Sequence, residues 1–289
     1  MSSTQVLKSR IRSVKNTKQI TKAMQMVAAS KMRRVQEATK ASAPYTDVAS
    51  EILTYLASQG VTRQHKLFET RQIKSRLLIV IASDKGLAGA YNSNIVKAYT
   101  MALVDDDKNK IKNQTIAIGR KANHFVTRLK DTEVIGVYEG LPDQPSGRDL
   151  RAILDTARDR FISEEVDAVD VIYTKFISGM RQEVQVKRVL PAGFVETEVG
   201  NMIREALYEP DLETVLDGVV YRLIGAQIFQ AFLDSKASEL SMRMVAMKNA
   251  TDNASDLVDD LTLEMNKARQ GAITQELAEI SGGVEALKD

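Results

Sequence analysis

The glycine pair Gly86 and Gly89 is the strongest candidate in this sequence for a nucleotide or phosphate site. It follows an apolar run, Leu77–Ala82, that predicts a buried strand, and it precedes a helical pattern. Glycine-rich loops between a strand and a helix can cradle a phosphate. No third glycine and no Gly-Lys-Ser/Thr follows here, however, and Asp84 would repel a phosphate. We therefore interpret the segment as a tight strand-to-helix turn, and we expect no cofactor.

Other residue types that carry chemistry are sparse or badly placed. There is no cysteine, which excludes thiolate catalysis, and the two histidines, His65 and His124, have no cluster of ligands near them. The carboxylate pair Asp259 and Asp260 falls on the outer face of a helical pattern, where nothing would shift a pKa for acid–base work. The sequence thus predicts neither a metal site nor an active site.

Charge is distributed very unevenly along the chain. Residues 1–40 hold ten Lys and Arg against one acid, Glu37, whereas residues 211–289 hold fourteen acids and seven bases. The basic stretch 8–40 suits DNA, RNA or an anionic membrane, and equally a solvated helix face opposite an acidic protein. No aromatic side chain lies among these bases, so stacking on single-stranded nucleic acid is not expected. The two ends of the chain are complementary in charge and can lie side by side.

The last eighty residues predict one long helix, since no proline follows Pro210. Core-type residues recur in steps of four and three, the spacing that keeps one stripe facing a partner helix. They are Leu240, Met244, Met247, Thr251, Ala254, Val258, Leu261, Met265, Ala268 and Ala272. A second stripe comprises Ile273, Leu277, Ile280, Val284 and Leu287. Seventy helical residues would make a rod of roughly 105 Å, which indicates a mechanical or interaction element.

Residues 3–59 predict a first helical arm with its own stripe. Its core-type residues are Leu7, Ile11, Val14, Thr21, Met24, Ala28, Lys31, Val35 and Ala38. Pro44 is expected to bend or interrupt this arm, because proline removes a backbone donor. Residues 60–74 are polar and basic and are interpreted as a linker.

Between the arms, strands alternate with helices, which indicates a parallel sheet with covered faces. The fourth strand is followed by an alternating segment, Gln182–Val189, expected to be an edge strand. Asp211 is the expected N-cap of the long helix. The fold class is thus α/β plus long α, an antiparallel coiled coil of the terminal helices with an inserted Rossmann-like α/β domain. The expected domains are 1–60, 75–200 and 208–289.

Several stretches resemble the gamma subunit of F-type ATP synthases of the bacterial type. Its opening helix is matched by Ile11–Arg34 (IRSVKNTKQITKAMQMVAASKMRR), and its first strand and turn by Ser83–Asn92 (SDKGLAGAYN). Its terminal helix is matched by Glu239–Ala254 (ELSMRMVAMKNATDNA) and Asn266–Glu279 (NKARQGAITQELAE). The resemblance covers both ends and the middle in the right order.

This resemblance implies a non-catalytic rotor shaft that couples ion-driven rotation of a c-ring to ATP synthesis and hydrolysis. The implied partners are the alpha and beta subunits of the catalytic ring, the epsilon subunit and the c-ring, with no nucleic acid and no direct membrane span. The implied location is the cytoplasmic face of the bacterial plasma membrane, held there through the complex. Two alternatives remain open: a basic coiled-coil nucleic-acid-binding protein and a Rossmann-type enzyme.

The resemblance also implies roles for particular residues. Contacts to the beta subunit fall on Arg269, Gln270, Thr274, Met24 and Lys22. The apolar tip that turns in a collar of the ring falls on Ile280, Val284 and Leu287. Contacts to the c-ring and epsilon fall on Tyr208 and Glu209.

Overall fold

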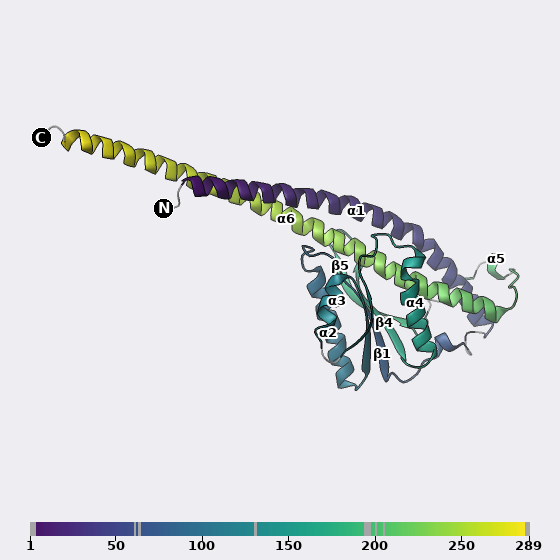
Figure 1. Ribbon diagram of the computed structural model, residues 1–289. Coiled ribbons are helices and arrows are strands. Elements are labelled where there is room, and N and C mark those ends of the chain that lie inside the picture. The colour runs from purple at the N-terminus through teal and green to yellow at the C-terminus, as the bar shows by residue number, and fades with distance from the viewer. Residues whose placement is uncertain are drawn as a thin grey trace. The chain divides into compact units, whose positions relative to one another are not determined.

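A computed structural model describes residues 4–60, 62, 65–129, 132–193, 198–199, 201–204 and 206–286. The chain forms two compact units, one of Met1–Ala28 with Arg243–Asp289 and the other of Ala29–Met242. Two long helices, α1 (Thr4–Ser58) and α6 (Leu212–Ala286), belong to both units (Figure 1). The boundary between the two units falls inside both long helices, after Ala28 and before Arg243, whereas the predicted domain limits fall between secondary-structure elements. Those limits remain a prediction.

Helix α1 continues without a break through Pro44, so the predicted interruption is wrong. A proline inside a helix removes one backbone hydrogen bond. On either side of it, Val35, Leu53 and Leu56 are fully buried. Apolar burial of that extent outweighs the loss of one hydrogen bond. Helix α6 begins as predicted, because the Thr214 N–H donates to Asp211 Oδ1 at 2.8 Å.

In the first unit, the beginning of α1 pairs with α6 through the predicted stripes. Leu7, Ile11, Thr21 and Ala28 are buried on α1, and Met247, Thr251 and Ala254 on α6. The Thr21 and Thr251 hydroxyls lie 2.7 Å apart. An antiparallel register from this pair sets Thr4, the first residue of α1, opposite Ala268. Among the described side chains of α6, burial ends at Ala268, which confirms the antiparallel coiled coil.

In the second unit, five strands form one sheet in the order β3-β2-β1-β4-β5. The strands are β1 (Ser75–Ile81), β2 (Lys112–Ile118), β3 (Glu133–Tyr138), β4 (Ala168–Phe176) and β5 (Gln182–Leu190). The first four are parallel, and β5 pairs antiparallel with β4 at the edge, as predicted. The remaining elements are α2 (Tyr91–Lys108), α3 (Arg120–Val126), α4 (Gly147–Ile162), α5 (Asn201–Arg204) and a 3-10 turn, η2 (Lys66–Phe68).

Both faces of the sheet are covered by helices (Figure 1). Ile95 and Tyr99 of α2, with Val126 of α3, pack on one face. Helix α4 and the first part of α6 pack on the other face, joined by Leu53 and Leu56 of α1. The predicted linker 60–74 also contributes to this core, because η2 buries Leu67. One part of each long helix therefore packs into the core of the inserted domain.

Candidate functional site

The strand order places the switch point of the sheet between β1 and β4, where doubly wound folds bind their ligands. Helix α6 occupies this crevice. The Thr174 N–H donates to Ser235 Oγ at 3.1 Å, and the Tyr91 hydroxyl lies 2.9 Å from the same oxygen. Ser238 Oγ donates to the Thr174 carbonyl at 3.1 Å. A cavity of about 10 Å³ remains beside α6, room for about one water molecule and far too little for a nucleotide.

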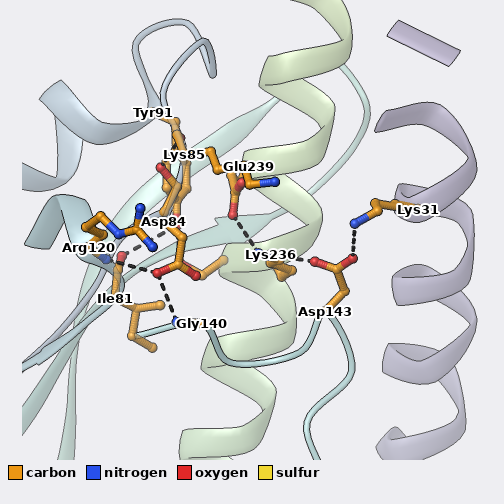
Figure 2. Close-up of polar contacts among 12 residues, drawn as sticks. Lys31, Ile81, Asp84, Lys85, Tyr91, Arg120, Gly140, Asp143, Lys236 and Glu239 are labelled. Carbon is orange, nitrogen blue, oxygen red and sulfur yellow. Dashed lines mark hydrogen bonds and ion pairs between the residues drawn. The ribbon is translucent and has the colours of Figure 1, made fainter. Parts of the chain in front are cut away.

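The Gly86–Gly89 segment forms the expected turn, with Gly89 at φ +56°. Beside it, Asp84 Oδ1 accepts the backbone N–H groups of Arg120 and Gly140, each at 3.1 Å (Figure 2). Arg120 is the first residue of α3, the helix that follows β2, whereas the phosphate-binding turn of a dinucleotide site follows the first strand. The Asp84 carboxylate lies beside the turn and would repel a phosphate, so the residues present do not fit one.

A polar network next to this crevice joins both long helices to the loop that follows β3 (Figure 2). Asp143 Oδ2 lies 2.7 Å from Lys31 Nζ of α1, and Asp143 Oδ1 lies 3.2 Å from Lys236 Nζ of α6. Lys236 Nζ also lies 3.1 Å from Glu239 Oε2. Positive and negative groups therefore alternate from α1 through the loop to α6.

The pKa values of Asp143 and Lys236 are both shifted in favour of the charged form. Burial raises the pKa of Asp143, but the hydrogen bond from Lys31 and the charge of Lys236 outweigh it, and the pKa lies below its ordinary value. Burial lowers the pKa of Lys236, but the charges of Glu239 and Asp143 outweigh it, and that pKa is raised. Asp143 and Lys236 are therefore both charged near neutral pH. Sequence reasoning missed the network, and the signal was Lys31, a charged residue at a core-type position.

A groove of about 1190 Å³ runs between α4 and α6 in the second unit. Its lining includes the arginines Arg148, Arg151, Arg158 and Arg222 and the apolar residues Leu150, Leu154, Ile228 and Phe229. The Arg158 guanidinium lies 5.1 Å from the centre of the Tyr221 ring, and the Tyr221 hydroxyl donates to Asp155 at 2.7 Å. Such a lining suits a partner surface that is acidic and partly apolar. No pattern in the sequence predicted this groove.

The residues expected to contact the beta subunit lie on two segments of the first unit. Arg269, Gln270 and Thr274 are exposed on α6, and the Thr274 hydroxyl donates to the Gln270 carbonyl at 2.9 Å. On α1, Lys22 is exposed and donates to Gln25 at 3.3 Å, whereas Met24 is half-buried. The long side chains of α6 are therefore free to meet a partner, and Met24 contributes mainly to the coiled coil.

The predicted apolar tip lies on the part of α6 that passes beyond Ala268. Every described side chain from Arg269 to Ser281 is exposed, including the apolar Ile273, Leu277 and Ile280. Ile280 has 65% of its surface exposed. Val284 lies within α6, but its side chain and the whole of Leu287 fall outside the described residues. The described part of the second stripe is therefore unpaired within this chain.

Tyr208 and Glu209, expected at the c-ring and epsilon, differ in their surroundings. The Tyr208 ring stacks on Tyr55 at 5.3 Å, and its hydroxyl donates to the Ile203 carbonyl at 2.7 Å. Glu209 is exposed. Two nearby apolar residues that sequence reasoning missed, Met202 and Leu207, are 86% and 90% exposed. Tyr208 thus supports the segment from within, whereas Met202, Leu207 and Glu209 present exposed side chains.

The described residues bear on the remaining expectations. Within them, no group of His, Cys, Asp and Glu side chains is placed to hold a metal ion. Over the same residues, no helix combines the length and the apolar character needed to cross a membrane. The bases Lys8, Arg10, Arg12 and Lys15 are exposed on α1, as a solvated face or a partner surface requires.

Comparison with known proteins gives one consistent family. A family model described as ATP synthase matches residues 3–287. The ATP synthase gamma chain of Macrococcus caseolyticus is 40% identical over 289 residues and covers 100% of both chains. That of Ralstonia nicotianae is 39% identical over 292 residues, with 99% of this chain and 100% of the relative covered.

Solved structures agree with this assignment at the level of the fold. A chain in the central stalk and c-ring structure of the Tetrahymena thermophila mitochondrial ATP synthase is 25% identical with a TM-score of 0.64, and the match covers 80% of this chain and 99% of that chain. A chain of the Euglena gracilis mitochondrial ATP synthase is 19% identical with a TM-score of 0.70, covering 99% and 94%.

Proposed function

The chain belongs to the family of ATP synthase gamma chains, and from this membership we propose that it is the central rotor shaft of an F-type ATP synthase. It couples ion-driven rotation of the c-ring to ATP synthesis and hydrolysis at the ring of alpha and beta subunits. The observation that carries the proposal is the end of α6, where every described side chain from Arg269 to Ser281 is exposed. A helix extended this far beyond its partner, with apolar side chains on it, requires a surface outside the chain.

The shaft itself performs no catalysis in this proposal. Helix α6 fills the ligand crevice of the sheet, and the Asp84 carboxylate beside the Gly86–Gly89 turn would repel a phosphate. ATP turnover then belongs to the surrounding ring, and this chain contributes rotation. The nucleic-acid alternative gains no support, because the relatives are ATP synthase gamma chains over their full length.

Contacts to the beta subunits are assigned to Arg269, Gln270 and Thr274 on α6, with Lys22 and Met24 on α1. A rotor needs contacts that form at one angle and break at the next. Exposed donors suit this task better than a broad apolar interface, because a hydrogen bond to a charged group contributes only about 1.5–3 kcal/mol. The exposed positions of Arg269, Gln270 and Lys22 support the assignment.

The contact with the collar of the ring and the contact with the c-ring and epsilon are assigned to other parts of the chain. Ile280, with Val284 and Leu287 beyond it, forms the tip that turns in a collar of the ring, where an apolar seat offers no directional bonds to resist rotation. The segment of Tyr208 and Glu209 meets the c-ring and the epsilon subunit. The chain is then held peripherally at the cytoplasmic face of a bacterial plasma membrane by these contacts.

Reconstitution tests the proposal directly. The full chain is mixed with a complex of three alpha and three beta subunits, and we expect copurification in a ratio of one chain per ring and ATP-driven rotation of a bead attached to this chain. Assembly without rotation, or no assembly at all, would contradict the proposal. DNA affinity that falls steeply with salt would instead support the nucleic-acid alternative.

A further inference from the structure

We infer that Asp143 is a positioning residue for torque transfer, because its carboxylate ties α1 and α6 to each other and to the inserted domain. The inference rests on the proposed function for its consequence in the motor, although the tie itself is a property of the free chain. All residues involved lie within the unit Ala29–Met242. The arrangement is drawn in Figure 2.

The tie is needed because α1 and α6 are attached to the inserted domain in different ways. Helix α6 is bonded to the sheet through Ser235 and Ser238 at Thr174, and through Ser241 Oγ, which donates to the Gly179 carbonyl at 2.9 Å. Helix α1 contacts α6 here largely through apolar packing, with Val35 in a cluster with Leu233, Ala237 and Leu240. Apolar packing is non-directional, so it resists separation of the helices better than it resists sliding or twisting.

Two adjacent residues of one loop make directional contacts to this part of α1. Asp143 bonds Lys31 at 2.7 Å, and the Gln144 side-chain amide donates to the Arg34 carbonyl at 2.7 Å. These two contacts are about one helical turn apart on α1. Together they fix both the rotation and the axial position of the helix relative to the loop.

The loop is itself anchored on both sides of Asp143, so it can carry load. Before it, the Gly140 N–H donates to Asp84, and Leu141 packs against the main core. After it, Ser146 forms a capping box with Asp149 at the start of α4, with Ser146 N to Asp149 Oδ2 at 2.6 Å. A displacement of the inserted domain is therefore passed to Asp143 through fixed neighbours.

Within the network, Asp143 is the residue whose substitution should weaken the contact to α1 without disturbing the fold. Without Asp143, half-buried Lys236 retains Glu239 at 3.1 Å, and Lys31, with 41% of its side chain exposed, returns to solvent. Loss of Lys236 is different, because Glu239 is 5% exposed and would be left in a buried site without its lysine. Asp143→Asn should therefore weaken the attachment of α1 to the loop, whereas Lys236→Met should destabilise the folded unit.

The first experiment uses the free full-length chain and hydrogen exchange of its backbone amides. In Asp143→Asn we expect exchange in residues 29–39 of α1 to accelerate roughly two- to fivefold, the factor that corresponds to losing a partly exposed ion pair. Exchange in 232–241 of α6 should be unchanged, because the serine bonds remain. Lys31→Met should give the same pattern, and the conservative Lys31→Arg should retain the wild-type protection.

The second experiment measures coupling in the assembled complex. With Asp143→Asn we expect unloaded ATP hydrolysis to match wild type, while ion transport per ATP hydrolysed falls and the torsional fluctuations of a shaft-attached probe increase. Lys31→Arg serves as the matched control, with normal transport. Equal fluctuations and transport in fully assembled Asp143→Asn would overturn the torque role, and unchanged exchange in 29–39 would overturn the tie. Failure of the wild-type chain to assemble would instead count against the proposed function.

Discussion

The hydroxyl oxygens of Thr21 and Thr251 lie 2.7 Å apart, buried, and separated by 230 residues of sequence. Each also approaches a backbone carbonyl of its own helix, Lys18 for Thr21 and Met247 for Thr251. Polar groups in a coiled-coil seam favour one register, because a shift leaves them buried without partners. This pair therefore sets which part of α6 remains beyond the end of α1.

A disulfide should form between these positions in Thr21→Cys/Thr251→Cys. The chain has no other cysteine, and the two hydroxyls lie 2.7 Å apart, so a small movement of the side chains would bring two sulfurs to the S–S bond length of about 2.05 Å. We expect nearly complete oxidation, read as a mobility shift in a non-reducing gel. Thr21→Cys/Leu263→Cys is the control, because Leu263 is 57% exposed. Equal cross-linking in both variants, or none in the first, would argue against this register.

The sequence predicted this seam well, because it depends on a local repeat. Steps of four and three identified the buried positions of α6 as far as Ala268. Ala272 was also expected in the stripe, yet it is exposed, because α1 begins at Thr4 and offers no partner that far. The periodic pattern identifies the face of a helix, while the length of its partner decides how much of that face is covered.

The polar network could not be predicted in the same way. Lys31 and Asp143 are 112 residues apart, and their contact depends on how the loop after β3 docks between two helices. Likewise, the turn at Gly86 was predicted from composition, but the filling of the crevice by Ser235 was not. Contacts of this kind arise from tertiary packing, which no local pattern encodes.

Gly119→Ala should destabilise the chain severely, whereas Gly86→Ala should not. Gly119 has φ +92°, and an added Cβ would lie 2.2 Å from the Ala82 carbonyl oxygen. Strain and clash together should reduce the free energy of unfolding by more than about 3 kcal/mol. At Gly86 the nearest atom to an added Cβ is Lys121 Cε at 4.0 Å, so we expect a change within about 0.5 kcal/mol. Urea denaturation of both variants measures this difference, and similar losses would contradict it.

Asp234→Asn should stabilise the chain at neutral pH. Burial raises the pKa of Asp234 to about 6, against the opposing hydrogen bond from Gln230 and the charges of Lys175 and Lys187. The folded state therefore holds this proton more tightly than the unfolded state does. Its contribution to stability is present below about pH 4 and is lost as the pH rises through about 6.

The size of this effect follows from the shift in pKa. A rise of about two units corresponds to roughly 3 kcal/mol, as an upper limit for the gain in Asp234→Asn above pH 6. Free energies of unfolding measured from pH 4 to 8 should diverge between wild type and variant over the lower part of this range and then run parallel. A constant difference across the whole range would show that Asp234 titrates normally.

Arg269→Ala/Gln270→Ala should impair coupling in the assembled complex without unfolding the chain. Both side chains are exposed on α6, just beyond Ala268, the last half-buried one among the described side chains, and alanine is the best helix former at such positions. The free energy of unfolding of the isolated variant should therefore stay within about 0.5 kcal/mol of wild type. Rotation-driven ATP turnover should slow, because the directional contacts to the beta subunit are lost.

A matched variant separates contact from general change on the same helix. Lys248→Ala removes an exposed cation of α6 within the segment that pairs with α1, so turnover in that complex should equal wild type. Assembly yield must be measured beside turnover, since a poorly assembled ring would also be slow. Losing two hydrogen bonds to a charged partner, each about 1.5–3 kcal/mol, should slow turnover at least tenfold if both act at the limiting angle. Full turnover in a fully assembled double variant would leave Arg269 and Gln270 as solvated surface and would transfer the coupling role to other exposed residues of α6.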